Sequence, residues 1–167
     1  MPSEITKYHT FWKRLAAGII DVIIFIPFYY CSDLITDHNS LRIFLHFLVF
    51  VLSAIYSIFL HGKYGQTIGK KVLNIKVYSL DEESLIGLKR AFYRDSIWVI
   101  TEVAGLIYFL IISSQTTKAT NTQSNYEDFV STVSFLLFIL ELVTMFLNFK
   151  RRALHDYLAK SVVINLD

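Results

Sequence analysis

The stretch "RLAAGIIDVIIF", residues 14–25, decides the fold, because it begins an apolar run that continues past Tyr30. A run of about 20 apolar residues is long enough for a helix that crosses a bilayer. This run contains an aspartate, and an acid at the bilayer centre costs about 2.5–3.5 kcal/mol on insertion scales. Helical spacing of i, i+3, i+4 and i+7 places four residues on one face: Arg14, Ala17, Gly18 and Asp21. Because small residues let another helix come close, we predict that this face packs inward through Ala17 and Gly18 and shields Asp21.

The composition indicates a membrane protein. Of the 167 residues, 54% are hydrophobic and only 18% are charged, whereas soluble domains carry about 25% charged residues. The net charge of +2 gives no reason to expect a nucleic-acid partner. The expected surroundings are therefore a lipid bilayer.

Four apolar segments are long enough to span that bilayer. They cover residues 15–35, 41–61, 96–114 and 129–149. All lysines and arginines except Arg42 and Lys118 lie at or before Arg14, within residues 62–95, or after residue 149. The positive-inside rule then predicts that both termini and the 62–95 loop are cytoplasmic and that the 115–128 loop is extracytoplasmic. We expect a single multi-pass domain in the inner (plasma) membrane of the cell.

Two short strands are predicted outside the membrane. "VLNIKVYSL", residues 72–80, alternates apolar and polar side chains, and "SVVINL", residues 161–166, is a second β-type run. Strand pairing is tolerated only outside lipid or where protein buries it, so we predict that the two strands pair at the membrane surface. "LIGLKRAFYRD", residues 85–95, predicts an amphipathic helix that leads into the third span. The expected fold class is an all-α membrane protein, a bundle of four transmembrane helices with a small cytoplasmic β element and interfacial helices.

The stretch "GQTIGKK", which begins at Gly65, is similar to a phosphate-binding loop but does not match the Walker A pattern. That pattern requires glycine where Tyr64 stands and serine or threonine where Lys71 stands. We interpret Gly65 and Gly69 as positions for tight turns and close backbone approach. Lys70 and its neighbour are expected to contact anionic lipids.

Two more acids, Glu102 and Glu141, fall within predicted spans. If the helices bring them together with Asp21, three carboxylates would suit a proton or a monovalent cation. The alternative is a structural polar network that locks the bundle. The histidines show no zinc-type spacing and no nucleophile motif accompanies them. We therefore expect no enzyme activity, no cofactor and no metal site.

Three stretches in order resemble the RDD family of small membrane proteins. They are "RLAAGIIDVIIF", then "GQTIGKKVLNIKVYS" with an acidic turn and "GLKRAFYRD", and finally "RRALHDYLAKSVVI". The family is named for one arginine and two aspartates, which match Arg14, Asp21 and Asp156 by motif. The resemblance implies a polytopic membrane protein. Cation/proton antiport with sodium, lithium or potassium has been proposed for some members, and others resemble accessory subunits of membrane complexes.

Two hypotheses for the function follow from these patterns. The leading one is a small transporter, a cation/proton antiporter in which Asp21 exchanges a proton for a cation and Arg14 tunes its charge. Four spans leave little room for an enclosed pathway in one monomer, so a homo-oligomer is expected. The alternative is a non-catalytic assembly factor or scaffold subunit, which would bind a membrane protein partner.

Overall fold

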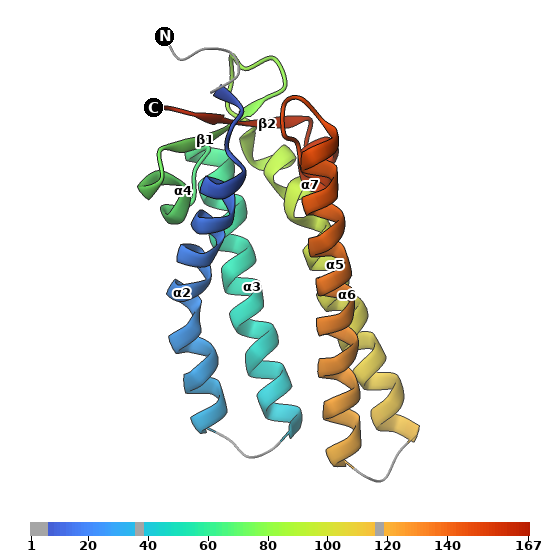
Figure 1. Ribbon diagram of the computed structural model, residues 1–167. Coiled ribbons are helices and arrows are strands. Elements are labelled where there is room, and N and C mark those ends of the chain that lie inside the picture. Colours follow the sequence, from blue (N-terminus) through green and yellow to red (C-terminus); the bar gives the residue numbers. More distant parts are fainter. Residues whose placement is uncertain (1–6, 36–38, 116–118) are drawn as a thin grey trace.

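The computed structural model describes residues 7–35, 39–115 and 119–167, and most of these are helical (Figure 1). The long helices are α2 (Phe11–Ile35), α3 (Asn39–Tyr64), α5 (Gly87–Gln115) and α6 (Ala119–Leu147). The short elements are α4 (Ile68–Val72), β1 (Ile75–Ser79), α7 (Leu154–Leu158) and β2 (Ser161–Asn165). The long helices form two antiparallel pairs, α2 with α3 and α5 with α6, which we call the two hairpins (Figure 1). The short elements lie at one end of the molecule, in a layer that we call the cap, residues 65–86 and 148–167 (Figure 1).

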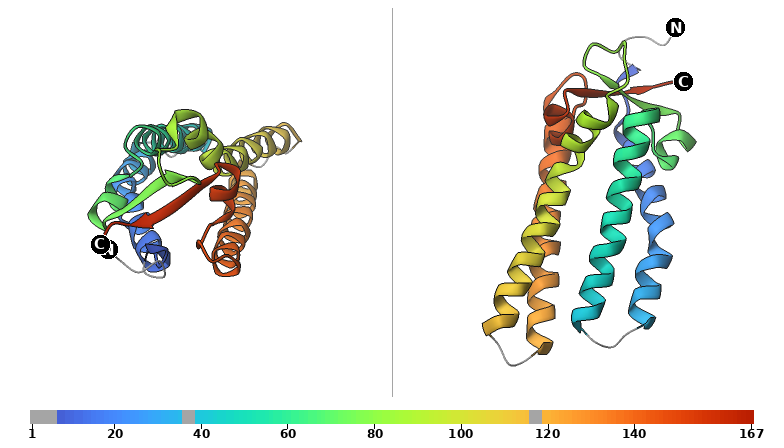
Figure 2. Two further views of the ribbon diagram at one scale, coloured as in Figure 1. Left: turned by 90° about the horizontal axis from the view of Figure 1, so that it is seen from above. Right: turned by 180° about the vertical axis from the view of Figure 1, so that it is seen from behind.

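The two hairpins stand side by side beneath the cap. α3 packs along α5, and within each hairpin the two helices contact each other. Seen from above, β2 crosses over the space between α2 and α6 (Figure 2). These two helices approach each other near the cap, where the rings of Phe11 and Phe146 lie 4.8 Å apart. The cap therefore covers one end of both hairpins.

Three helices in the described part of the chain are long and apolar enough to cross a membrane: Phe11–Ile35, Leu41–Tyr64 and Asp128–Leu147. They coincide with the first, second and fourth predicted spans. Large apolar side chains on these helices are exposed, as those of Leu34 and Leu136 are, which suits helices surrounded by lipid. These features fit a membrane location. The third predicted span, 96–114, lies within α5, which is not one of the three, so the structure supports three of the four predicted spans.

Two helix boundaries differ from the prediction. The sequence predicts a loop over 115–128, but α6 begins at Ala119, while residues 116–118 lie outside the described part. The helix extends this far because no glycine or proline interrupts the polar residues before Asp128. α3 continues to Tyr64 rather than ending at His61, and it ends there because Gly65 adopts a positive φ of 71°.

β1 and β2 form the predicted two-stranded sheet. They pair antiparallel, with Val77 opposite Val163. Alternate side chains of β1, those of Ile75, Val77 and Ser79, are buried, which is the alternation that the sequence predicts. Val77 and Val163 then pack against Ala17 of α2 in one apolar cluster. The sheet thereby ties the last residues of the chain to the first hairpin.

An ion cluster around Glu82 joins the two segments of the cap to each other and to the N-terminal residues Lys7 and Tyr8. Lys7 and Lys150 each place Nζ within 2.6 Å of the Glu82 carboxylate, and the Tyr8 hydroxyl donates to it over 2.6 Å. Burial alone would raise the pKa of Glu82, but the hydrogen bonds from Lys150, Lys7 and Tyr8 outweigh it and lower the pKa to about 2. The carboxylate is therefore ionised over the physiological range.

Helix α4 docks directly on the backbone of α2. A Cβ atom at Gly69 would lie 2.2 Å from the carbonyl oxygen of Ala17, so only glycine permits this approach. Gly18 does not make the close helix contact that the sequence predicts. Apart from its chain neighbours and its own helix backbone, no described atom lies within 4 Å of the place its Cβ would take. The contact that was expected across Ala17 and Gly18 is made by Ala17 alone.

The Glu82 cluster predicts an acid-sensitive component of stability. Because the folded-state pKa of Glu82, about 2, lies below its ordinary value of 4.5, its contribution is present above pH 4.5 and is lost as the pH falls toward 2. Thermal unfolding in detergent at pH 6, 4 and 3 should show a modest decrease of the unfolding temperature as the pH falls. The Glu82→Gln variant should not show this decrease. The exposed Glu83→Gln is the matched control and should retain the wild-type pH dependence. An identical pH dependence in wild type and Glu82→Gln would contradict the prediction.

Candidate functional site beneath the cap

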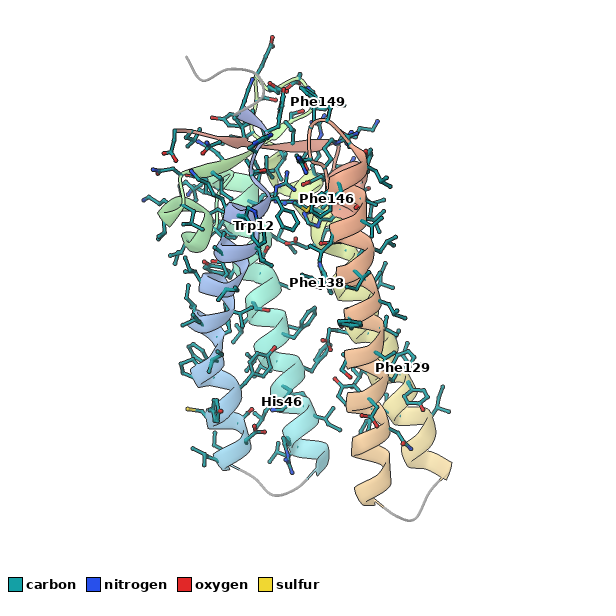
Figure 3. All side chains as sticks on the ribbon, in the orientation of Figure 1. Trp12, His46, Phe129, Phe138, Phe146 and Phe149 are labelled. Carbon is teal, nitrogen blue, oxygen red and sulfur yellow. The ribbon has the colours of Figure 1, made fainter. Side chains whose placement is uncertain are left out.

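A cavity of about 800 Å³ lies between the two hairpins, beneath the cap. Its cap end is lined by charged and polar side chains: Arg14, Asp21, His61, Lys70, Arg94, Asp95, Glu141 and His155. Farther from the cap the wall is mostly apolar and includes Ile23 and Phe138. Phe138 lies on α6 farther from the cap than Phe146 (Figure 3). The cavity is thus amphipathic, with its charges gathered at one end.

The buried carboxylate of Asp156 lies behind the cavity wall and holds the charged side chains at the cap end in position. Asp156 is 0% exposed; Arg14 Nη1 donates to its Oδ2 over 2.5 Å, and Arg94 Nη2 lies 3.2 Å from its Oδ1. Ser161 Oγ and the Ala153 backbone N–H also donate to it, each over 3.1 Å. Burial would raise the pKa of Asp156, but the charges of Arg14 and Arg94 outweigh it and hold the pKa well below its usual range. An ionised Asp156 therefore joins α2, α5 and α7.

A second pair, Glu141 and His155, lies in the cavity wall. His155 Nδ1 is 2.6 Å from Glu141 Oε1, and His155 Nε2 is 2.8 Å from Arg94 Nη2. Arg94 can only donate, so Nε2 accepts and the imidazole proton lies on Nδ1, which donates to Glu141. A protonated Glu141 still has a carbonyl oxygen that accepts this bond. Glu141 and His155 therefore form a hydrogen-bonded carboxyl–imidazole pair in the cavity wall.

Lys70, which the sequence predicts to contact anionic lipids, lines the cavity. Its Nζ donates to His61 Nε2 over 2.5 Å, and the other ring nitrogen of His61 contacts Ser57 Oγ at 3.1 Å. Burial, followed by the positive charge of Arg94, lowers the pKa of Lys70 well below its usual value. The neighbouring Lys71 is exposed instead.

Asp21 is held in a separate network of hydrogen bonds. Its Oδ1 accepts from the Tyr56 hydroxyl and the Gly69 backbone N–H, each over 2.9 Å, and its Oδ2 accepts from Thr67 Oγ1 over 2.6 Å. Thr67 is itself the N-cap residue of α4. Asp21 thus fixes the first turn of α4 against α2 and α3. Arg14, two turns away on α2, bonds to Asp156 instead.

The predicted cluster of Asp21, Glu102 and Glu141 does not form. Each of the three carboxylates has a different partner, and that of Glu102 is the Tyr126 hydroxyl at 3.5 Å. Glu102 is not among the residues that line the cavity. In the part of the chain that the structure describes, no group of three acidic, histidine or cysteine side chains could hold a metal ion. The prediction of this cluster is wrong because helical spacing shows only which residues share a face of one helix. It does not show how that face is turned toward the other helices.

A family model described as "RDD family" matches residues 8–160. This chain belongs to the RDD family. RDD proteins are small membrane proteins, and the matched region contains both hairpins and ends just before β2. Neither a curated protein nor a solved structure matches the chain.

In this RDD protein, the sequence reasoning missed several side chains that line the cavity. Arg94 is the most important, because it contacts both Asp156 and His155. Arg94 follows Ala91 by about one helical turn, and the structure buries both residues. Lys89 and Arg90 belong to the same basic stretch as Arg94, but they are exposed. Only the packed structure distinguishes the arginine that faces inward.

Substituting Asp156 should be strongly destabilising. Asp156→Asn leaves two buried guanidinium groups without a counter-charge, and breaking a buried pair from one side costs about 3–5 kcal/mol. Detergent-solubilised protein should show a much lower unfolding temperature and a smaller monodisperse fraction. Asp167→Asn is the matched control, because Asp167 pairs with Lys13 at the surface, and it should change little. Equal stability of the two variants would contradict a central role for Asp156.

Proposed function

We propose that this RDD protein is a membrane transport protein that takes an amphiphilic molecule from the bilayer into its cavity. The observation that carries the proposal is the division of the cavity into a charged end beneath the cap and an apolar remainder. A molecule with a polar head and an apolar tail matches both parts. A small hydrophilic ion would match only the charged end.

The apolar part of the cavity wall is accessible, which supports uptake of an apolar tail. Ile23 of α2 and Phe138 of α6 line the cavity and are 57% and 39% exposed. The two helices contact each other near the cap through Phe11 and Phe146. A molecule in the bilayer could therefore reach the apolar wall between α2 and α6 below that contact.

The topology that we propose retains α5 as a fourth span and places the cap in the cytoplasm. The last residues of α2 and α5 and the first residues of α3 and α6 lie at the end of the molecule away from the cap (Figure 1). If α6 crosses the membrane between that end and the cap, the chain must first cross in the other direction, and α5 is the segment that connects the two ends. The basic residues in the 62–95 segment and after residue 149 support a cytoplasmic cap at the plasma membrane.

Cation/proton antiport is the second candidate function, and the Glu141–His155 pair favours it. This pair places a carboxyl group, hydrogen-bonded to an imidazole, in the cavity wall. The proton-carrying residue would then be Glu141 rather than Asp21, because both oxygens of Asp21 already hold α4 in place. Because Glu102 does not line the cavity with Asp21 and Glu141, the three-carboxylate site no longer supports a bound cation.

The amphiphile proposal predicts that lipid chains reach Trp98, which lines the cavity. Trp12→Phe leaves Trp98 as the single tryptophan of the chain, and bromine atoms on lipid acyl chains quench a tryptophan that they contact. In this background, Gly18→Phe should fill open space in the cavity and reduce the quenching of Trp98. Gly18→Ala, at the same position, should leave the quenching strong. Equal quenching in the two variants, or none in either, would refute the proposal.

The antiport candidate predicts proton movement that depends on a monovalent cation. Proteoliposomes with a trapped pH indicator should respond to a sodium or potassium gradient, and Glu141→Gln should abolish the response. Glu102→Gln is the matched control, since Glu102 does not line the cavity. Absence of cation-dependent flux in the wild type, or unchanged flux in Glu141→Gln, would eliminate this candidate.

A further inference from the structure

The charged end of the cavity contains buried polar atoms that no protein group satisfies. Arg14 Nη2, Arg94 Nε and Nη1, and Asp95 Oδ2 have no hydrogen-bond partner within the described part of the chain. Arg94 is 3% exposed and the Arg14 side chain 8%. All three side chains line the cavity. Buried donors and acceptors are normally paired, so these atoms indicate that another molecule completes the site.

The chemistry of these atoms specifies two features of that molecule. Guanidinium groups present N–H donors in a planar fork that matches the oxygens of a phosphate. The free carboxylate oxygen of Asp95 requires a donor instead, and a primary ammonium group supplies N–H donors with an opposite charge. Arg14, Arg94 and Asp95 all lie close enough to Lys70 for their charges to act on it, which places them at one end of the cavity.

The charge balance of the wall favours a zwitterion over a dianion. The charged residues in the wall comprise three bases and three acids: Arg14, Lys70, Arg94, Asp21, Asp95 and Glu141. A ligand with several negative charges and no positive charge would leave the free Asp95 oxygen facing like charge. A head group that carries both a phosphate and an ammonium group meets the orphaned donors and the orphaned acceptor together.

We propose that the cavity binds a phospholipid whose head group bears a primary amine, with the phosphate at Arg14 and Arg94 and the ammonium at Asp95. Its acyl chains lie along the apolar wall between α2 and α6. This inference rests on the proposed function, because it names the class of amphiphile that the cavity takes up.

The test compares lipids that differ only in the amine. The full chain, purified in mild detergent, is incubated with equal amounts of phosphatidylethanolamine, its mono- and dimethylated forms, phosphatidylcholine and phosphatidylglycerol, all with identical chains. Native mass spectrometry measures the lipid retained. The primary amine should be retained about tenfold over phosphatidylcholine, with retention falling at each methylation, because hydrogen bonds to a charged group are worth about that factor. Phosphoethanolamine without chains should not be retained.

Variants assign the preference to Asp95. Asp95→Asn should reduce the ratio of phosphatidylethanolamine to phosphatidylcholine to about one, while Glu83→Gln, an exposed substitution with the same charge change, should keep it. The methylation series requires no variant, so it tests the head-group preference even if Asp95→Asn fails to fold. Equal retention across that series, preferential retention of phosphatidylglycerol, or retention of free phosphoethanolamine would overturn the inference. Phospholipid retention without head-group preference, with Trp98 still quenched, would overturn this inference and leave the proposed function standing.

Discussion

The carboxylate of Asp156 lies between the guanidinium groups of Arg14 and Arg94 with none of its surface exposed. Arg14 is in the first turns of α2, Arg94 is near the start of α5, and Asp156 is in the cap. One buried carboxylate therefore joins both hairpins to the chain segment that leads into β2. A buried charge is tolerated only when it is paired and hydrogen-bonded, so this arrangement requires α2, α5 and α7 to be in place together.

Two arginines around one carboxylate also leave an excess of donors. Asp156 cannot accept from every N–H of Arg14 and Arg94, since it also accepts from Ser161 and Ala153. The nitrogen atoms that remain unpaired belong to side chains in the cavity wall. The interaction that stabilises the cap is thus also the one that gives the cavity its binding chemistry.

The family resemblance singles out Asp21 and Asp156. Each of these aspartates holds a short helix of the cap in place, but at a different position in the fold. Asp21 fixes α4 to the first hairpin, and Asp156 fixes α7 between the hairpins. Every carboxylate oxygen of these two residues accepts at least one hydrogen bond from the protein. The groups with unused hydrogen-bonding capacity are found elsewhere, at Arg14, Arg94 and Asp95. This difference is why our proposals assign ligand binding to the cavity wall.

The sequence by itself determined the apolar spans, the two strands and the alternation that buries Ile75 and Val77. These features depend on local spacing, because a span needs length and a strand needs a two-residue period. Only the tertiary structure decided that Lys70 lines the cavity, that Glu102 does not line it although Glu141 does, and that Arg14 bonds to Asp156 rather than to Asp21. The physical reason is that an ion pair depends on how separate helices are rotated and placed, and residues 142 positions apart meet only after the cap has formed.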